Sequence, residues 1–176
     1  MLEKGMFSRV QYTTCAHYQD MEGWPSYWNG FPPLMHPTHA LGTCFMLLND
    51  WPKEVYAKGS GRIRKQLEEK YHSPFSFEAA FVTMETSDVA IEVERFLYGV
   101  ARSYSECFRI YGSERSFEWQ QLASENPVLY TRTGNIQEEI PDADGDPDRF
   151  KRGGEVTEQR IKIPDYGCRL PESIAG

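Results

Sequence analysis

Four segments in which apolar and polar residues alternate, joined by very short connections, constrain the fold of this chain more than any other feature. They occupy residues 75–86, 89–101, 106–112 and 115–122. Parallel neighbours need a long crossover, so these connections favour antiparallel pairing of each segment with the next, as in a meander. Residues 91–94 alternate two β-branched side chains with two glutamates, which gives the sheet one apolar and one charged face. We therefore expect an α+β fold, in which helices pack on one face of an open, mainly antiparallel sheet.

The part of the chain before these segments is expected to supply another strand, a long loop and a helix. Residues 6–14 alternate as a strand does, whereas residues 15–34 are rich in Gly, Pro and aromatic side chains, which is typical of an irregular loop. Residues 38–49 carry apolar side chains at the spacing of a mostly buried helix. Because proline is tolerated only in the first turn of a helix, this helix is expected to begin near Pro37 or Thr38.

Two further elements are expected between this helix and the first of the four segments. Residues 52–61 have the composition of a strand that ends at two glycines. Residues 62–72 are predicted to form a charged helix that carries Ile63 and Leu67 on one face.

The segment 134–160 differs from the rest in composition. It is acidic, rich in glycine and nearly free of large apolar side chains, so we expect an exposed loop. Its Asp-rich residues 142–146 superficially resemble a calcium-binding loop, but the Gly and the Glu of the EF-hand spacing are missing. The chain as a whole, residues 1–176, is expected to form a single domain.

The charge of the chain argues against a nucleic-acid partner. Lys and Arg number 19 against 26 Asp and Glu, which gives a net charge of -7, and no basic run is interleaved with aromatic side chains. No apolar segment approaches the roughly 20 residues that span a bilayer, and the first residues lack the apolar core of a signal peptide. No membrane partner is expected, and the expected location is the cytoplasm. The four cysteines show no Cys-x-x-Cys spacing, so we expect reduced thiols.

His39 is the first candidate for a catalytic residue. It lies in the first turn of the expected helix, beside a Pro-rich loop, and histidine is the usual side chain for moving a proton near neutral pH. A capping or purely structural histidine is the alternative. Together with the loop residues His17 and Asp20, the pair His36 and His39 has the donor types of a metal site. However, Pro37 places His36 at or before the helix cap, so no metal is expected.

The loop 15–34 also has the side chains that a site for a small polar ligand requires. Trp24 and Trp28 can offer flat apolar faces to a sugar ring, while Tyr18 and Asp20 can bond its hydroxyl groups. His36 adds a polar group after the loop. The alternative is that these aromatic side chains only cover the sheet or an interface. The sequence contains no G-x-G-x-x-G, no Walker A loop, no G-x-S-x-G and no H-E-x-x-H motif.

Four stretches in a fixed order resemble a known family. They are "GMFSRVQY", "HYQDMEGWPSYWNGFPPLMHPTHALG", "SFEAAFVTME" and "FRIYGSERSFEWQQ". Together they resemble the C-terminal substrate domain of the Gfo/Idh/MocA oxidoreductases, the family of glucose-fructose oxidoreductase and inositol dehydrogenase. The resemblance covers nearly the whole chain up to about Gln121. It implies the open sheet of a dihydrodipicolinate reductase-like C-terminal domain.

The resemblance also implies a cofactor and a second domain. In this family an N-terminal Rossmann domain binds NAD or NADP, and a Glu-Lys-Pro motif there supplies a lysine that polarises the substrate hydroxyl. Both features are expected upstream of Met1, and the chain of longer relatives continues past Gly176. The isolated chain is therefore expected to be a fragment that is inactive by itself, and the open sheet is expected to form a homo-oligomer. The substrate that the family implies is a small sugar or polyol.

By resemblance, His39 corresponds to the family's cleft histidine and would act as base on the substrate hydroxyl. Many members carry an Asp four residues earlier, where this chain has Met35, so the Asp–His pairing is expected to be lost. One branch of the family, in which His36 is commonly Tyr, contains glycosidases that oxidise a sugar transiently; there Asp20 and Tyr18 would be candidates for proton transfer to the leaving group. A non-catalytic interaction module is the third alternative.

Overall fold

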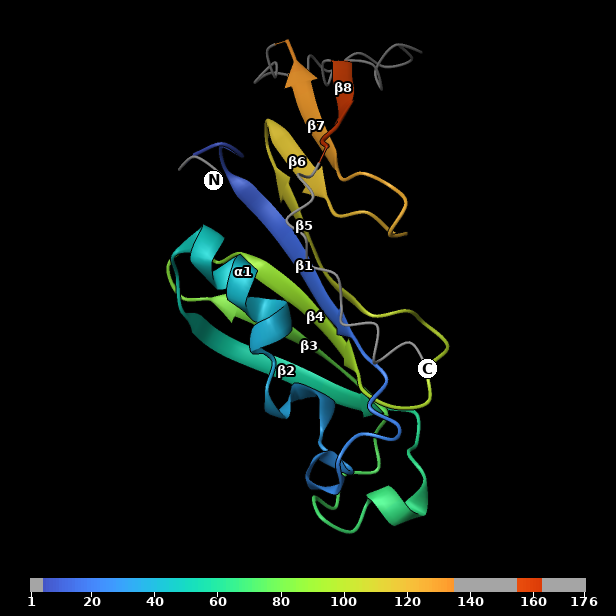
Figure 1. Ribbon diagram of the computed structural model, residues 1–176. Coiled ribbons are helices and arrows are strands. Elements are labelled where there is room, and N and C mark those ends of the chain that lie inside the picture. Colours follow the sequence, from blue (N-terminus) through green and yellow to red (C-terminus); the bar gives the residue numbers. More distant parts are fainter. Residues whose placement is uncertain (1–4, 135–154, 163–176) are drawn as a thin grey trace, which may run out of the picture.

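The computed structural model describes residues 5–134 and 155–162, and it contains one long sheet with a helix on one face (Figure 1). Its eight strands are β1 (Val10–Tyr18), β2 (Pro52–Ser60), β3 (Phe77–Met84), β4 (Ala90–Phe96), β5 (Ser105–Gly112), β6 (Arg115–Glu118), β7 (Val128–Thr133) and β8 (Glu155–Arg160). In the described part of the chain the α-helix is α1 (Thr38–Leu48), and single 3-10 turns are η1 (Ser26–Trp28), η2 (Pro33–Met35) and η3 (Lys65–Leu67).

The strand order confirms the expected fold class but not the meander. The order across the sheet is β2-β3-β4-β1-β5-β6-β7-β8, and every neighbouring pair is antiparallel except β1 and β4. The first strand of the chain therefore lies between β4 and β5, whose short connection had predicted that they pair directly. Strands lie about 5 Å apart, so the connection 97–104 is long enough to pass the end of one intervening strand. Connection length alone could not distinguish these two arrangements.

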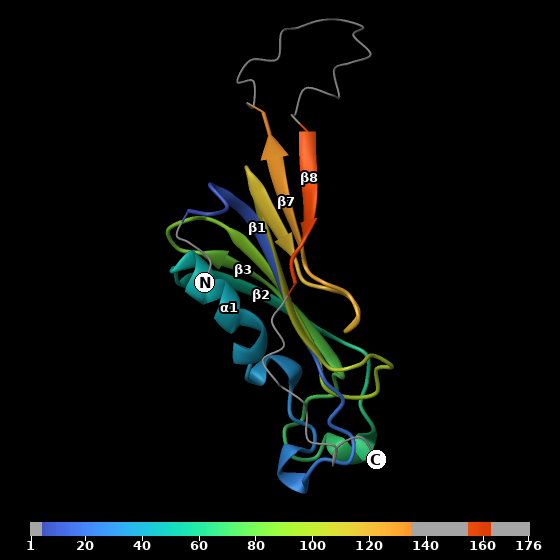
Figure 2. The ribbon, with the colours of Figure 1, turned by 45° about the horizontal axis from the view of Figure 1, so that its top comes forward.

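Helix α1 covers β1, β4 and β5, and the main core lies beneath it (Figures 1 and 2). Residues that are register partners in adjacent strands form apolar rows on this face of the sheet. One row is Ala80, Val93, Cys15 and Phe108. The core cluster also includes Ala40, Leu41 and Cys44 of α1. The helix predicted at this position is therefore present and packs on one face of the sheet. It is not mostly buried, because only these three of its 11 residues are buried and Met46 is 84% exposed.

Two predicted elements differ from the structure, one at its ends and the other in kind. The strand predicted over 6–14 begins at Val10 and extends to Tyr18, because Cys15 and His17 continue the buried alternation into residues that were expected to form a loop. The helix predicted over 62–72 is only the single turn η3. Ile63 is its one fully buried apolar anchor, and a short charged helix without an apolar stripe does not offset the cost of nucleation.

The prediction of an exposed acidic loop over residues 134–160 is also partly wrong. Residues 155–160 form β8, which pairs with β7 along its full length. Residues 135–154, which include the calcium-like run, and Cys168 lie outside the described residues. Cys15, Cys44 and Cys107 are free thiols. Among the described helices none is long and apolar enough to span a bilayer.

Opposite to α1, the sheet has a second face that no described helix covers (Figure 2). We call this the open face. Tyr56 and Phe81 are register partners on it and are 68% and 50% exposed. Further in, the hydroxyl of Tyr18 donates a hydrogen bond to Glu94, and the Tyr18 ring stacks on Phe96. The charged side chains of β4 therefore bond to tyrosines on this face.

Candidate functional site

A row of polar side chains replaces the apolar rows at one end of the helix-covered face. Its members are register partners in four adjacent strands, and we call them the polar row: Glu78, Arg95, His17 and Glu106. The neighbouring row, two residues along each strand, is entirely apolar. His17 and Arg95 are only 2% and 4% exposed. Buried polar side chains need partners, so the contacts of this row determine what it can do.

Arg95 ties the polar row to the loop that was expected to bind a ligand. Its Nη1 atom donates to the carbonyl oxygens of Pro33 and His36, at 2.6 Å each, and its Nε atom donates to Nδ1 of His17 at 3.0 Å. Burial lowers the pKa of Arg95, while the charges of Glu106 and Glu78 act in the opposite direction. Arg95 therefore holds the backbone that leads into α1 at a fixed position above the sheet.

His17 is held as a neutral imidazole by the same contact. Its Nδ1 atom accepts a hydrogen from Arg95, so the remaining ring proton is on Nε2. Burial, together with the positive charge of Arg95, lowers the pKa of His17 to about 4. The Nε2 atom is buried and has no hydrogen-bond partner among residues 5–134 and 155–162.

His39 lies beside His17 and contacts a carboxylate. The two ring centroids are 5.0 Å apart. Nδ1 of His39 lies 2.9 Å from Oε1 of Glu106, and the Tyr104 hydroxyl donates to the same oxygen. Burial raises the pKa of Tyr104 to about 12, and its bond to Glu106 contributes, so the phenol keeps its proton at neutral pH. With Nδ1–H donating to Glu106, the Nε2 lone pair of His39 is left free to accept a proton.

The carboxylate of Glu106 changes one expectation from the sequence. The Asp–His pairing was expected to be lost because Met35 occupies the position of the Asp, and the Met35 side chain is indeed 60% exposed. A carboxylate nevertheless reaches the histidine, from β5 rather than from the turn before α1. His39 therefore has a carboxylate partner that the local motif did not indicate.

The two histidines line a pocket of about 590 Å³ between the polar row and the loop. Trp24, Trp28 and Phe31 form an aromatic wall, and Trp28 meets each of the other two edge-to-face. Gln19, Asp20 and Arg102 add polar groups to the lining. An aromatic wall with a few placed donors and acceptors is the arrangement that binds small polar ligands.

Most of the residues selected from the sequence lie together in this pocket. His39, Asp20, Trp24, Trp28 and His36 all line it. Asp20 also accepts a hydrogen bond from the backbone N–H of Glu22.

Tyr18 is the exception, because its side chain is on the open face. Tyr18 therefore does not line the pocket that contains His39.

Glycine at position 30 is required for the shape of this loop. Gly30 has a positive φ of 71°, and a Cβ there would lie 1.8 Å from the carbonyl oxygen of Leu67. The loop thereby packs on η3, and Trp28 and Phe31 join Leu67 in a second small apolar cluster. Tyr98 links the loop to the sheet, since its hydroxyl donates to the carbonyl oxygen of Trp28 and accepts from the N–H of Phe31.

The described residues form neither a metal site nor a dinucleotide site. No group of three or more His, Cys, Asp or Glu side chains is arranged there to hold a metal ion. Nor do the residues fit a dinucleotide: α1 begins after Pro37 without a side-chain cap, and the turn before it is η2, not a Gly-rich phosphate loop. Residues 5–134 and 155–162 therefore lack a cradle for the phosphates of NAD or NADP.

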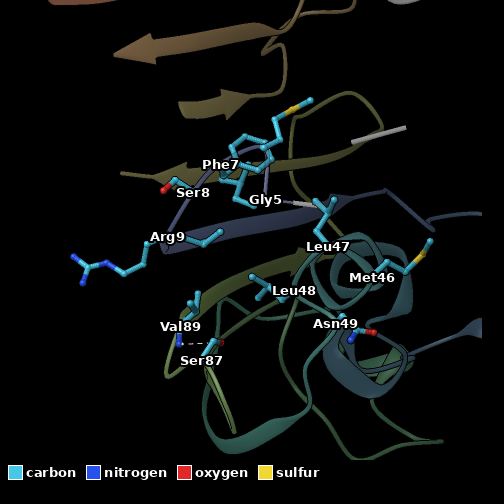
Figure 3. A pocket seen from close by; sticks show the side chains of 13 residues that line it. Gly5, Phe7, Ser8, Arg9, Met46, Leu47, Leu48, Asn49, Ser87 and Val89 are labelled. Atoms are coloured by element: carbon cyan, nitrogen blue, oxygen red, sulfur yellow. Dashed lines mark hydrogen bonds between the residues drawn. The ribbon is translucent and has the colours of Figure 1, made fainter. Parts of the chain in front are cut away.

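A larger hollow, of about 700 Å³, lies at the other end of α1 (Figure 3). Figure 3 shows Leu47 and Leu48 of α1 opposite Phe7 and Val89. Arg9 is the one ionisable side chain among its described lining residues, and in Figure 3 it points away from the hollow. The described lining of this hollow includes no carboxylate, histidine or cysteine.

Arg95 and Glu106 were missed in the sequence although a signal for both was present. Alternation puts Arg95 in phase with Ile91 and Val93, and it puts Glu106 in phase with Phe108. A charged residue in the buried phase of a strand needs a specific partner, and this marks a candidate site. That the two strands flank His17 depends on the strand order, which the sequence did not reveal.

Comparison with models of known protein families gives no match, and comparison with curated proteins gives none either. Solved structures do match. UDP-N-acetylglucosamine 3-dehydrogenase GnnA from Acidithiobacillus ferrooxidans is 12% identical over 89% of this chain and 41% of that one, with a TM-score of 0.54. Levoglucosan dehydrogenase in complex with NADH and L-sorbose is 14% identical over 93% of this chain and 42% of that one, with a TM-score of 0.56.

A third match has the same extent. An inositol dehydrogenase homolog from Azotobacter vinelandii, complexed with NAD+, is 15% identical over 91% of this chain and 39% of that one, with a TM-score of 0.54. The chain thus spans about two fifths of each of these dehydrogenases, and identity this low supports the fold alone. The structure therefore confirms the fold that the resemblance to the C-terminal domain of the Gfo/Idh/MocA oxidoreductases implies.

Proposed function

We propose that this chain is the substrate-binding part of an NAD(P)-dependent oxidoreductase that acts on a hydroxyl group of a sugar or polyol. The observation that carries the proposal is the hydrogen bond between His39 and Glu106 at the rim of an aromatic-walled pocket. A histidine whose Nδ1–H is held by a carboxylate presents Nε2 as a base, which is what removal of a hydroxyl proton requires. The matched dehydrogenases, among them those of levoglucosan and inositol, support this substrate class.

His39 is the proposed proton acceptor, and Glu106 is a positioning residue that acts through it. The negative charge of Glu106 stabilises the imidazolium that forms when His39 takes a proton. Tyr104 donates to Glu106 and so fixes the carboxylate. Trp24 and Trp28 would contact the apolar face of the sugar ring, while Asp20 and His36 would bond its hydroxyl groups.

The nicotinamide cofactor is proposed to be held by polypeptide other than the described residues, because these do not fit its phosphates. This separation can be tested by calorimetric titration of the 176-residue chain with NAD and with NADP. We expect no binding at micromolar concentrations. Micromolar binding would contradict the assignment of the chain to the substrate side alone.

The function is tested on the full-length protein that carries this chain. Levoglucosan and myo-inositol should be oxidised with net reduction of NAD or NADP, as followed by absorbance at the nicotinamide band. The alternative, a glycosidase with transient redox chemistry, is kept because Asp20 lines the same pocket as His39 and could protonate a leaving group. Such an enzyme would release a sugar without net reduction of the cofactor.

The open face is proposed to bind a second copy of this chain. Tyr56 and Phe81 place two large rings side by side on a surface that no described helix covers. Exposed aromatic rings of this kind are typical of interaction surfaces. A chain that self-associates but binds neither sugar nor polyol would support the remaining alternative, a non-catalytic interaction module. A homo-oligomer is therefore compatible with either role.

A further inference from the structure

Among the described residues, the Nε2–H group of His17 is the one buried side-chain group of the polar row without a hydrogen-bond partner. Nδ1 of the same ring accepts from Arg95 Nε, and Arg95 is itself fixed by two backbone carbonyl groups. The ring therefore cannot turn over to exchange its two nitrogens without breaking a buried hydrogen bond. A buried N–H group without an acceptor lowers the stability of the folded protein. Packing alone therefore does not explain why His17 occupies this position.

The ring of His17 contacts two other side chains that line the same pocket. The His39 ring lies over it at 5.0 Å with a tilt of 37°, and Tyr104 meets it edge-on at 5.6 Å. The His39 side chain is 54% exposed and is held at Nδ1 by Glu106. His17, His39 and Tyr104 all line the pocket of about 590 Å³, so a ligand in this pocket lies next to both imidazoles.

Both imidazoles line this pocket, and their Nε2 atoms have opposite hydrogen-bonding roles. His17 is a donor through Nε2–H, because Arg95 occupies its Nδ1. His39 is an acceptor through Nε2, because its Nδ1–H is directed at Glu106. A carbonyl oxygen can satisfy only the donor, and an ammonium group only the acceptor. A hydroxyl group can satisfy both at once.

We infer that His17 and His39 together bind one hydroxyl group of the ligand, with His17 as the donor to its oxygen and His39 as the acceptor of its proton. This inference rests on the proposed function and makes His17 a substrate-binding residue, where the sequence had offered it only as a metal ligand. Donation from His17 stabilises negative charge on the oxygen as its proton moves to His39. The pair thus selects an alcohol and prepares it for deprotonation.

The test is nuclear magnetic resonance of the 176-residue chain labelled with ¹⁵N-histidine, with long-range correlations that distinguish the two ring nitrogens. Signals of His17 are assigned by their loss in His17→Gln. In the free chain at neutral pH we expect the proton of His17 on Nε2. On titration with levoglucosan and with myo-inositol, we expect the Nε2 signals of both His17 and His39 to shift along the same binding curve. A proton on Nδ1 of His17 would overturn the inference.

Substitution gives an independent measurement with the same two probes. His17→Phe removes the donor and should weaken binding about tenfold, whereas the Gln amide can both accept from Arg95 and donate to the ligand, so His17→Gln should stay within about threefold. If His17→Phe does not fold, the inference is still tested by the position of the His17 proton in the labelled wild-type chain and by the affinity of His17→Gln. Equal affinity of wild type and a folded His17→Phe would overturn the inference.

The indole signals of Trp24 and Trp28 separate failure of this inference from failure of the proposed function. If a probe shifts these indoles and His39 but leaves His17 unchanged, the ligand binds without His17, and only the inference is wrong. If neither probe shifts any signal of the pocket, the chain does not bind this substrate class. That result would overturn the proposed function together with the inference.

Discussion

Nδ1 of His39 lies 2.9 Å from a carboxylate oxygen of Glu106, although the two residues are 67 positions apart in the chain. One stands at the start of α1 and the other near the start of β5. Their contact replaces a pairing that relatives are expected to make within one helical turn. The consequences of this contact, and of the polar row around it, can be measured.

Replacement of His39 by Ala should lower turnover of the full-length protein about a hundredfold, because the proposed proton acceptor is lost. The measurement is the steady-state rate with the polyol that the wild type oxidises. His72 is an exposed histidine with a positive φ of 55°, and His72→Asn, which tolerates that backbone, is the matched control. A near-normal rate of His39→Ala would assign His39 to structure.

Glu106→Gln keeps a hydrogen-bond acceptor for His39 but removes the negative charge. We expect kcat to fall about tenfold with KM nearly unchanged, because the charge no longer stabilises the imidazolium that forms when His39 takes a proton. The control is Glu94→Gln, since Glu94 also accepts from a tyrosine, but on the open face. An unchanged kcat, or a rise in KM that accounts for the whole loss, would contradict the positioning role.

Arg95→Met should destabilise the protein by about 3 kcal/mol, because it leaves two carbonyl oxygens and Nδ1 of His17 buried without a donor. Arg95→Lys should lie between Arg95→Met and wild type, since lysine cannot reproduce the planar fork. The free energy of unfolding is measured in urea, with exposed Arg62→Met as the control. Equal stability of Arg95→Met and wild type would show that the loop before α1 is held in another way.

Stability should also depend on pH through His17. The pKa of its imidazole is about 4 in the folded protein against 6.5 for the free group, so the unfolded state binds more protons between these values. The stabilisation is complete above pH 6.5 and is lost as the pH falls toward 4. In His17→Gln the difference in unfolding free energy between pH 7 and pH 4.5 should shrink by about 2 kcal/mol. His72→Asn should leave that difference as it is in wild type.

Phe81→Lys should shift the chain toward the monomer without loss of stability, because Phe81 is 50% exposed on the open face. Sedimentation velocity over a range of concentrations measures the change. Met46→Lys is the matched control, since Met46 is 84% exposed on α1 at the opposite face. If Met46→Lys dissociates the oligomer and Phe81→Lys does not, the contact lies on the helix side.

The sequence predicted the local elements better than their pairing. Residues 38–49 have helical spacing and form α1, and alternation located β2 to β6, because both patterns depend on near neighbours. The position of β1 between β4 and β5 depends on contacts between distant segments, which no local pattern encodes. The candidate site divides in the same way: His39 and the aromatic loop were found locally, whereas Glu106 and Arg95 join them only through the strand order.

The insertion of β1 also has a consequence for the order of folding. Strand β1 is made first, but its partners β4 and β5 follow more than 70 residues later, as in the pairing of His17 with Arg95, 78 positions apart. Strand β1 gains its neighbour β4 only after Phe96 has been synthesised and its neighbour β5 only after Gly112, and each pairing has to offset the entropy of closing a long loop. The polar row is therefore complete only when the centre of the sheet closes, and a nascent or partly unfolded chain has no donor–acceptor pair to offer a ligand.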